Sequence, residues 1–266
     1  MTRTLDAAFA TAKAENRAAL VGYFPAGFPT VESSKRIVEA MVRGGVDVVE
    51  IGLPYSDPLM DGPVIQRAVE AALANGVRIS DVIDVVRAVA KTGAPTLVMS
   101  YWNPIERYGV HRFADELAEA GGVGVINPDL TPEEATDWIA ATDAAGVARV
   151  FLVAPSSTPE RLKIVTDVTN GFVYAASLMG VTGARTSLSD AAGVLVRRVR
   201  DITDRPIAVG LGVSTPEQAA QIAQYADGVI VGSAFVRAVL DAPDEAAAIV
   251  AVEQLANALA AGVRQR

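Results

Sequence analysis

Three acidic residues within residues 46–63 are the strongest candidates for chemistry in this chain. The apolar run VDVVEIG carries Glu50 near its end, and a loop rich in Pro, Gly, Ser and Asp follows with Asp57 and Asp61. Burial among valine and isoleucine disfavours a charged carboxylate, and acids perturbed in this way are common where protons are transferred. The segment therefore predicts acid–base chemistry. The alternative is that Glu50 pairs with an arginine and only closes part of a core.

The remaining residue types narrow that chemistry. The chain has no cysteine, which excludes disulfides, thiolate nucleophiles and cysteine-based metal sites. Its single histidine, His111, opens an expected helix, which argues against a histidine zinc site or a Ser-His-Asp triad. No lysine ends an expected strand, which disfavours a Schiff-base aldolase. Acid–base catalysis by carboxylates remains, with no metal and no covalent adduct. The lysines are Lys13, Lys35, Lys91 and Lys163.

Composition indicates an acidic α/β protein. The 266 residues are 51% hydrophobic but only 6% aromatic, and the net charge is −8. An acidic surface repels polyanions, so nucleic-acid binding is not expected. The first 20 residues alternate charged and apolar types, unlike a signal peptide, and no apolar stretch is long enough to span a membrane. We therefore expect a soluble cytoplasmic protein.

Strand-like and helix-like segments alternate along the whole chain. The strand-like segments are continuous apolar runs, which indicates parallel strands buried on both faces. The expected strands are 18–27, 46–52, 95–103, 122–129, 147–155, 171–177, 205–214 and 226–234. The expected helices are 4–15, 30–43, 63–74, 111–120 and 131–140, then helices that begin at Ser157 or Thr158, near Ser189 and near Thr215, and helical sequence at the C-terminus.

Eight strand–helix units in one chain predict a (β/α)8 TIM barrel with an extra N-terminal helix. A doubly wound open sheet is the alternative, but no G-x-G-x-x-G follows the first expected strand. No segment resembles a linker, so we expect residues 1–266 to form a single domain. Active sites of such barrels lie at the carboxyl ends of the strands. That edge would gather Glu50, Asp61, Tyr101, Asp129 and Tyr174.

Glycines at the last strand ends suggest a phosphate site. Gly183 comes after the sixth expected strand, and Gly212, Gly232 and Ser233 lie at the ends of the seventh and eighth. Glycine lets backbone N–H groups approach a ligand, and helix N-termini favour anions. Barrels commonly bind phosphate with the loops after strands seven and eight. The alternative is that these glycines only form tight turns.

Several motifs in order resemble the tryptophan synthase α-subunit family over nearly the whole chain. The most specific is EIGLPYSDPLMDGPVIQ at residues 50–66, supported by NPDLTPEE, SLMGVTG, GLGVS and VGSA further along. The resemblance implies retro-aldol cleavage of indole-3-glycerol phosphate to indole and glyceraldehyde 3-phosphate. It implies that Glu50 is the general acid and base, and that Asp61 hydrogen-bonds the indole N–H. It also implies that Thr182 meets Asp61 when the loop after the sixth strand closes.

The resemblance assigns further residues to the substrate. Tyr174 would position the indole ring and Glu50, and Tyr23, Ile65 and Tyr101 would form the pocket walls. For these residues, packing without substrate contact is the alternative. The phosphate cradle would consist of Gly183, Gly212, Gly232 and Ser233.

The resemblance also implies a partner. A β subunit that uses pyridoxal phosphate (PLP) would condense indole with serine in an αββα tetramer, and this chain itself would need no cofactor. We expect contact through Pro54–Asp57 and the loop after the sixth strand. Tyr55, Met60 and Leu178 depart from residues common in the family, which affects loop packing and partner contact rather than the reaction. Two alternatives remain: a partner-binding regulator whose catalysis is dispensable, and a lyase that acts without a partner.

Overall fold

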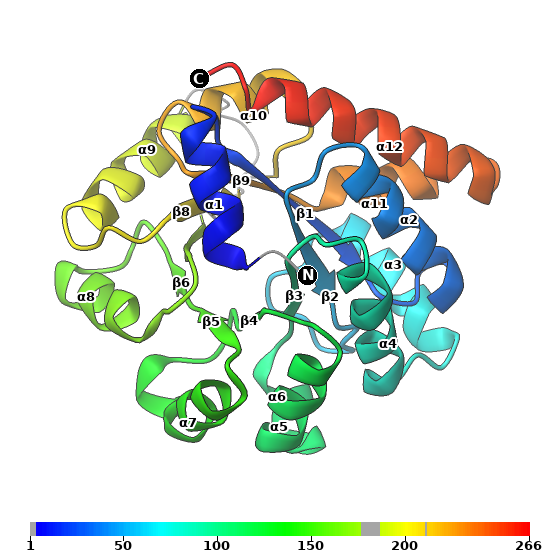
Figure 1. The fold of residues 1–266 in the computed structure, drawn as a ribbon, viewed down its shortest axis with the longest axis horizontal. Coiled ribbons are helices and arrows are strands. Elements are labelled where there is room, and N and C mark those ends of the chain that lie inside the picture. The colour runs from blue at the N-terminus through cyan, green and yellow to red at the C-terminus, as the bar shows by residue number, and fades with distance from the viewer. Residues whose placement is uncertain (1–3, 177–186, 211) are drawn as a thin grey trace.

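The chain folds into a ring of parallel strands surrounded by helices, as Figure 1 shows. The structure is a computed structural model that describes residues 4–176, 187–210 and 212–266. This confirms the predicted barrel. The strand segments are β1 (Ala19–Pro25), β2 (Val48–Gly52), β3 (Thr96–Met99), β4 (Gly124–Ile126), β5 (Ala148–Val150), β6 (Leu152–Val153), β7 (Val173–Ala176), β8 (Ile207–Gly210) and β9 (Gly228–Val231).

The barrel closes through the predicted strand 147–155. Hydrogen-bonded neighbours follow the order β5-β4-β3-β2-β1-β9-β8-β7-β6, so β5 and β6 are the two ends of that order. Only Phe151 separates them along the chain. β5 pairs with β4 and β6 pairs with β7, both in parallel. One predicted strand is thus divided into two short segments that join the ends of the sheet.

The helices surround this ring. Thr30, Thr158 and Thr215 each accept a backbone N–H of the helix that they cap, as the sequence predicted. The helices are α1 (Leu5–Ala14), α2 (Val31–Arg43), α3 (Pro63–Ala74), α4 (Ile79–Ala90), α5 (Trp102–Tyr108), α6 (Val110–Glu119), α7 (Thr136–Ala145), α8 (Pro159–Val168), α9 (Ser187–Arg200), α10 (Pro216–Ala223), α11 (Ser233–Leu240) and α12 (Glu245–Gly262), with a 3-10 turn, η1, at Pro132–Glu134. In the part of the chain described, every helix is too short or too polar to cross a bilayer.

Three local expectations were wrong or incomplete. Helix α4 was not predicted, although ISDVIDVVRAVA carries apolar residues at helical spacing and Asp81 accepts the Arg78 N–H at its start. The third strand stops at Met99 instead of continuing to 103, because α5, which was also not predicted, begins at Trp102. Thr131 does not cap a helix. Its hydroxyl donates to Glu134, and a 3-10 turn comes before α7.

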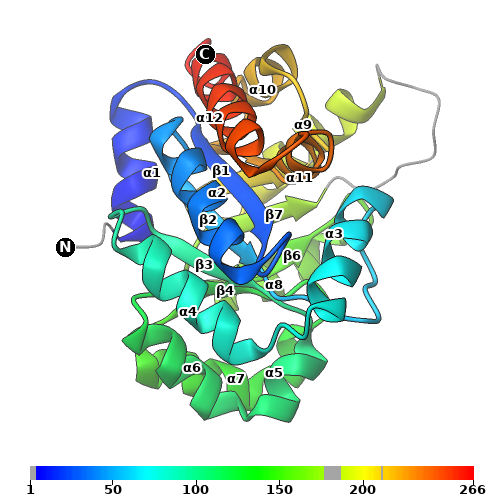
Figure 2. The ribbon, with the colours of Figure 1, turned by 90° about the vertical axis from the view of Figure 1, so that its right-hand side faces the viewer.

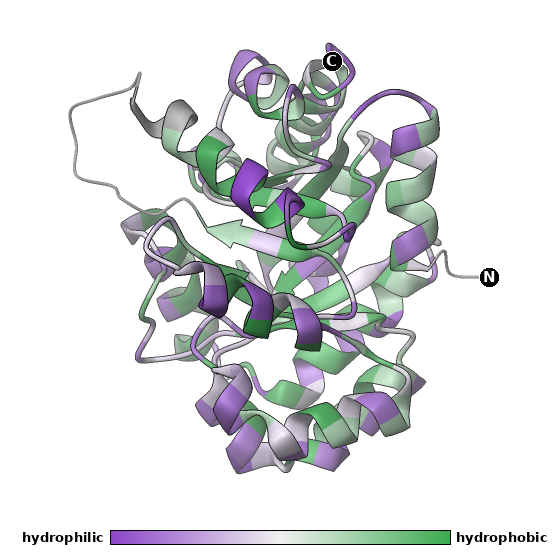
Figure 3. Ribbon diagram, turned by 90° about the vertical axis from the view of Figure 1, so that its left-hand side faces the viewer, coloured by the Kyte–Doolittle hydropathy of each residue, from purple (hydrophilic) through white to green (hydrophobic). Residues whose placement is uncertain are grey.

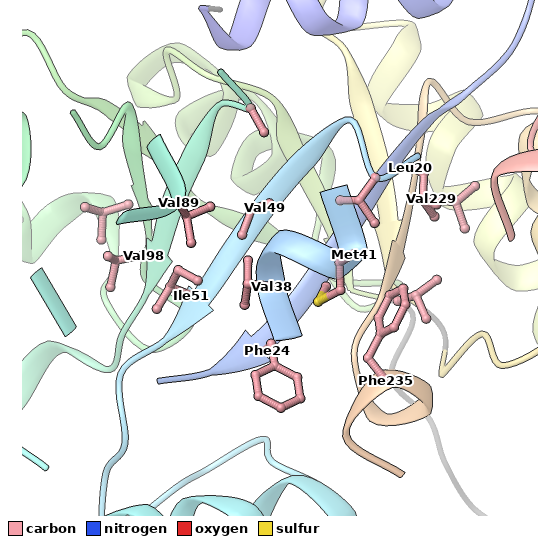
Figure 4. Packing of buried hydrophobic residues seen from close by; sticks show 14 of the residues in the cluster. Leu20, Phe24, Val38, Met41, Val49, Ile51, Val89, Val98, Val229 and Phe235 are labelled. Carbon is pink, nitrogen blue, oxygen red and sulfur yellow. The ribbon is translucent and has the colours of Figure 1, made fainter. Parts of the chain in front are cut away.

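An outer core lies between strands and helices. Along β1 and β2 the outward residues Leu20, Phe24, Val49 and Ile51 face Val38 and Met41 of α2 (Figure 4), and all six are fully buried. In Figure 3, apolar residues follow the strands while the outer helices present many polar residues. Alternation along each strand leaves the other set of side chains to fill the barrel interior.

Helix α1 closes one end of that interior. Leu5, Ala8, Phe9 and Ala12 form one apolar stripe that packs with inward residues of the strands, and Phe9 lies 5.4 Å from Phe172 between ring centroids. Figure 2 shows α1 on one side of the barrel and α3 on the opposite side. Because α1 fills one end of the barrel, a ligand-binding site is expected at the opposite end, where the strands have their carboxyl ends.

We expect Phe9→Ala to lower the free energy of unfolding by about 3–5 kcal/mol, because it removes a buried ring that fills the barrel. Urea unfolding measures the change. Lys13→Ala, on the exposed face of the same helix, is the control and should alter stability by less than about 0.5 kcal/mol. A Phe9→Ala variant as stable as this control would contradict the role of α1 as a closing element.

Candidate active site

Glu50 is a buried acid on the inward face of β2. Its register partners are Tyr23 of β1 and Leu97 of β3, and its exposed fraction is 0%. Neither carboxylate oxygen has a hydrogen-bond partner among the described residues. Burial alone raises the pKa of Glu50 to about 8. Among the described residues no arginine pairs with Glu50, and the carboxyl group holds its proton at neutral pH.

A cavity of about 290 Å³ opens beside Glu50 at the carboxyl ends of the strands. It brings together most of the predicted site residues from strands β1, β2 and β7, from the loops after β2, β8 and β9, and from the starts of helices α3 and α11. Predicted residues that line it are Tyr23, Glu50, Asp61, Ile65, Tyr174, Gly212, Gly232 and Ser233. Lining residues that were not predicted are Met60, Gly62, Met99, Ala176, Gly210 and Ile230.

The missed residues carry a signal in the sequence. Met99 and Ile230 are inward residues at strand ends, and Ala176 follows Tyr174 by two positions, the repeat that keeps side chains on one face of a strand. Applying that repeat to the last residues of every strand would have identified them. Met60 and Gly62 flank the predicted Asp61 in its loop.

Two tyrosines lie over glycines near Glu50. A Cβ atom on Gly52 would lie 2.3 Å from the Tyr23 hydroxyl, and one on Gly210 would lie 2.5 Å from the Tyr174 hydroxyl. Any side chain at these glycines would displace the tyrosines. Burial raises the pKa of Tyr23 and of Tyr174, and the nearby Glu50 carboxylate adds to both rises. Both phenols therefore stay neutral near the acid.

Asp61 is the second acid of the cavity, and its environment differs from that of Glu50. The Tyr101 hydroxyl donates to Asp61 Oδ1 at 3.1 Å and accepts the Met60 N–H at 2.9 Å. The Gln66 amide donates to the Asp61 carbonyl at 2.7 Å. Burial raises the pKa of Asp61, and the hydrogen bond from Tyr101 opposes that rise. Tyr101 contacts Asp61 without itself lining the cavity.

The N-terminus of α11 borders the same cavity. Ser233, its first residue, and Gly232, which precedes it, line the cavity, and none of the described side chains caps this helix end. By contrast, α10 is closed by a capping box between Thr215 and Gln218. Gly212 has φ +65°, a conformation that favours glycine. Free N–H groups at a helix start attract anions, which suits the phosphate end of a substrate.

Other predicted residues lie elsewhere. Thr182 and Gly183 fall outside the described residues, as does Leu178. Asp129 accepts the Trp102 N–H at 2.9 Å, so it caps α5 from a neighbouring loop. His111 is exposed on α6, as expected. Asp57 is exposed and accepts a hydrogen bond from Ser56.

The arrangement suits proton transfer to an organic substrate. A protonated acid, Glu50, and a hydrogen-bonded acid, Asp61, border one cavity whose far rim offers backbone N–H groups. In the described part of the chain, no group of three or more acidic or histidine side chains is arranged to hold a metal. Acids with different proton affinities can divide the roles of proton donor and charge stabiliser.

Comparisons with known proteins agree on one family. A family model described as "Tryptophan synthase alpha chain" matches residues 9–264. A relative of that name from Thermobifida fusca is 62% identical over 258 residues, 96% of each chain, and one from Streptomyces coelicolor is 59% identical over 98% of this chain and 96% of its own.

Solved structures agree as well. Tryptophan synthase from Mycobacterium tuberculosis matches with a TM-score of 0.92 and 52% identity over 99% of each chain. Tryptophan synthase subunit alpha from Legionella pneumophila matches with a TM-score of 0.88 and 35% identity over 99% of this chain and 98% of that one.

The raised pKa of Glu50 predicts a pH-dependent stability. The folded state holds this proton up to about pH 8, whereas the unfolded state releases it near pH 4.3. The stabilising contribution of the protonated group is complete below the unfolded pKa and is lost as the pH rises toward 8. We therefore expect wild type to lose up to about 1.4 kcal/mol per pH unit across this window relative to Glu50→Gln.

Urea unfolding of both proteins between pH 4.5 and 9 measures this difference. Glu119→Gln, which alters an exposed acid on α6, should follow the wild-type curve. Parallel curves for wild type and Glu50→Gln would contradict a carboxyl group that stays protonated in the fold.

Proposed function

The chain belongs to the tryptophan synthase alpha chain family, and from this premise we propose how its cavity carries out the reaction. The chain is a lyase that cleaves indole-3-glycerol phosphate to indole and glyceraldehyde 3-phosphate. Glu50 supports a catalytic role for residues of this chain. It is a buried carboxyl group beside the cavity, and it has no hydrogen-bond partner among the described residues. Its pKa of about 8 suits proton exchange at neutral pH.

Glu50 moves the protons in this proposal. Its carboxyl group donates a proton to C3 of the indole ring, which gives a cation delocalised onto the ring nitrogen. The resulting carboxylate then takes the proton of the hydroxyl on the carbon attached to C3. The bond between that carbon and C3 breaks, its electron pair returns to the ring, and an aldehyde forms. Glu50 ends protonated, so the proton count balances.

Asp61 stabilises the charge that develops on the ring. Its carboxylate accepts a hydrogen bond from the indole N–H and lies close to the cationic nitrogen after C3 is protonated. A fixed negative charge at that position stabilises the transition state more than the neutral substrate. The hydrogen bond from Tyr101 supports this role, because it favours the ionised form of Asp61 and fixes its orientation.

The other lining residues hold the substrate. Tyr174 and Tyr23 lie near Glu50 in the cavity wall, and Ile65 supplies an apolar wall for the ring. Gly232 and Ser233 bind the phosphate through the free N-terminus of α11 and the Ser233 hydroxyl, and Gly212 borders it from the loop after β8. For Thr182 and Gly183, the family resemblance alone supports contact with Asp61 and with the phosphate.

A β subunit is the proposed partner, in an αββα complex that uses PLP bound by the partner. The alpha designation of the relatives supports a multi-subunit enzyme, and the M. tuberculosis structures are of tryptophan synthase. The loop after β2 is the proposed contact, because Leu59 is 76% exposed there beside Asp57. We propose that this chain needs no cofactor of its own and, from the family's biosynthetic role, that it is cytoplasmic.

Replacing Glu50 with Gln should abolish the lyase reaction but not binding. We expect indole release from indole-3-glycerol phosphate to fall at least about 100-fold, the usual contribution of a general acid and base. Affinity for an unreactive analogue without the side-chain hydroxyls should change less than about threefold, because the phosphate and ring contacts remain. Indole absorbance and calorimetric titration measure the two quantities.

Measuring indole release by wild type and by Glu50→Gln, each with and without a β subunit, separates the alternatives. Wild-type release that rises strongly with the partner supports the synthase subunit, and fast release alone supports an independent lyase. If Glu50→Gln still turns over substrate like wild type, the proposed role of Glu50 is wrong. If wild type releases no indole in either condition, the proposed function is wrong.

The phosphate site predicts a different signature for Ser233→Ala. We expect KM to rise about three- to tenfold with kcat little changed, because a hydrogen bond to a charged group is lost far from the reacting bond. Steady-state kinetics with the phosphorylated substrate measure both constants. Ser214→Ala, at an exposed residue of the loop after β8, is the control. A fall in kcat at constant KM would contradict phosphate binding by Ser233.

A further inference from the structure

We propose that Tyr55 and Asn103 are positioning residues that hold Asp61 in place through Tyr101. This inference rests on the proposed role of Asp61. Four contacts connect two neighbouring loops: Asn103 to Tyr55, the Tyr55 ring to the Tyr101 ring, and the Tyr101 hydroxyl to both Met60 and Asp61. Tyr55 itself does not line the cavity.

Tyr101 is the inner end of this connection. It is 5% exposed, and its hydroxyl both accepts the Met60 N–H and donates to the Asp61 carboxylate. A hydroxyl that bonds the backbone on one side and a carboxylate on the other fixes the acid relative to its own loop. Burial raises the pKa of Tyr101 to about 12, so the hydroxyl remains a donor. The position of the Tyr101 ring therefore sets the position of Asp61.

Tyr55 is the outer end. Its ring packs on Tyr101 with centroids 5.5 Å apart and planes at 39°, and its hydroxyl accepts the Asn103 Nδ2–H at 2.8 Å. Tyr55 lies six residues before Asp61 in the same loop. The hydrogen bond to Asn103 holds Tyr55 against the loop after β3. The Tyr55 ring therefore stays packed on the Tyr101 ring and limits its movement.

The loop after β3 is the fixed side of this connection. The Trp102 N–H donates to Asp129, and the Asn127 amide donates to the Ser100 carbonyl at 3.0 Å. Asn127 and Ser100 are both buried. Asn103, at the start of α5, is thereby anchored to the β4 end of the barrel. Tyr55 is only half-buried, so its hydrogen bond to Asn103 adds to the packing that holds its loop.

Through these contacts the exposed amide of Asn103 influences the reaction inside the cavity. Loss of the Tyr55 hydroxyl leaves the ring in place but frees the loop that carries Asp61. A displacement of a charge-stabilising carboxylate lowers kcat more than substrate affinity, because the charge that it stabilises develops in the transition state. A purely structural hydrogen bond would change stability and leave kcat as it is.

The test measures indole release by the full chain, alone and with a β subunit, for Tyr55→Phe, Asn103→Ala, Tyr101→Phe and the Tyr55→Phe/Tyr101→Phe double variant. We expect Tyr55→Phe and Asn103→Ala each to lower kcat about three- to tenfold, with KM within about twofold. In the Tyr101→Phe background, Tyr55→Phe should have almost no further effect, because its route to Asp61 is already broken.

Tyr108→Phe is the matched control, since it removes another tyrosine hydroxyl, one that donates to Glu116 away from the cavity. It should keep wild-type kcat, and its thermal stability calibrates the loss of such a bond. Wild-type kcat in Tyr55→Phe, or an equal loss in both backgrounds, would overturn the inference. If wild type itself releases no indole, the proposed function fails instead.

Discussion

A carboxyl group inside a barrel of apolar side chains is the constraint on which the rest of this structure depends. Glu50 stands where its neighbours on adjacent strands are Tyr23 and Leu97, and water cannot solvate its charge. The fold accepts it because the proton remains bound, with a pKa of about 8. The same desolvation that disfavours the charge prepares the group to donate and recover a proton near neutral pH.

The surrounding architecture serves that one group. Helix α1 fills the opposite end of the barrel, so the interior below Glu50 is apolar, and the cavity lies above it. Glycines at Gly52 and Gly210 leave room for two tyrosines to lie across the strand ends. Asp61 reaches the cavity from a loop and depends on hydrogen bonds for its position, whereas the position of Glu50 is set by the strand itself. The two acids therefore differ in proton affinity and in how they are held in place.

The sequence predicted features that local patterns encode. Continuous apolar runs identified the strands, Ser and Thr caps marked several helix starts, and Glu50 was recognised as an acid within a strand. Features that depend on distant residues were missed. Asp129 of another loop accepts the N–H of Trp102, the first residue of α5, where the sequence predicted that the third strand continues. The hydrogen bonds from Asn103 to Tyr55 and from Tyr101 to Asp61 join residues 40 or more positions apart, and no single segment reveals them.

The central claim is that Glu50 is held protonated by burial. A titration of the 13C-labelled side-chain carboxyl of Glu50 by NMR, with the signal assigned by its loss in Glu50→Gln, tests this directly. The account predicts a single ionisation near pH 8. A midpoint near the ordinary glutamate value of about 4.3 would contradict it, because a carboxyl group that ionises there is solvated or paired rather than buried alone.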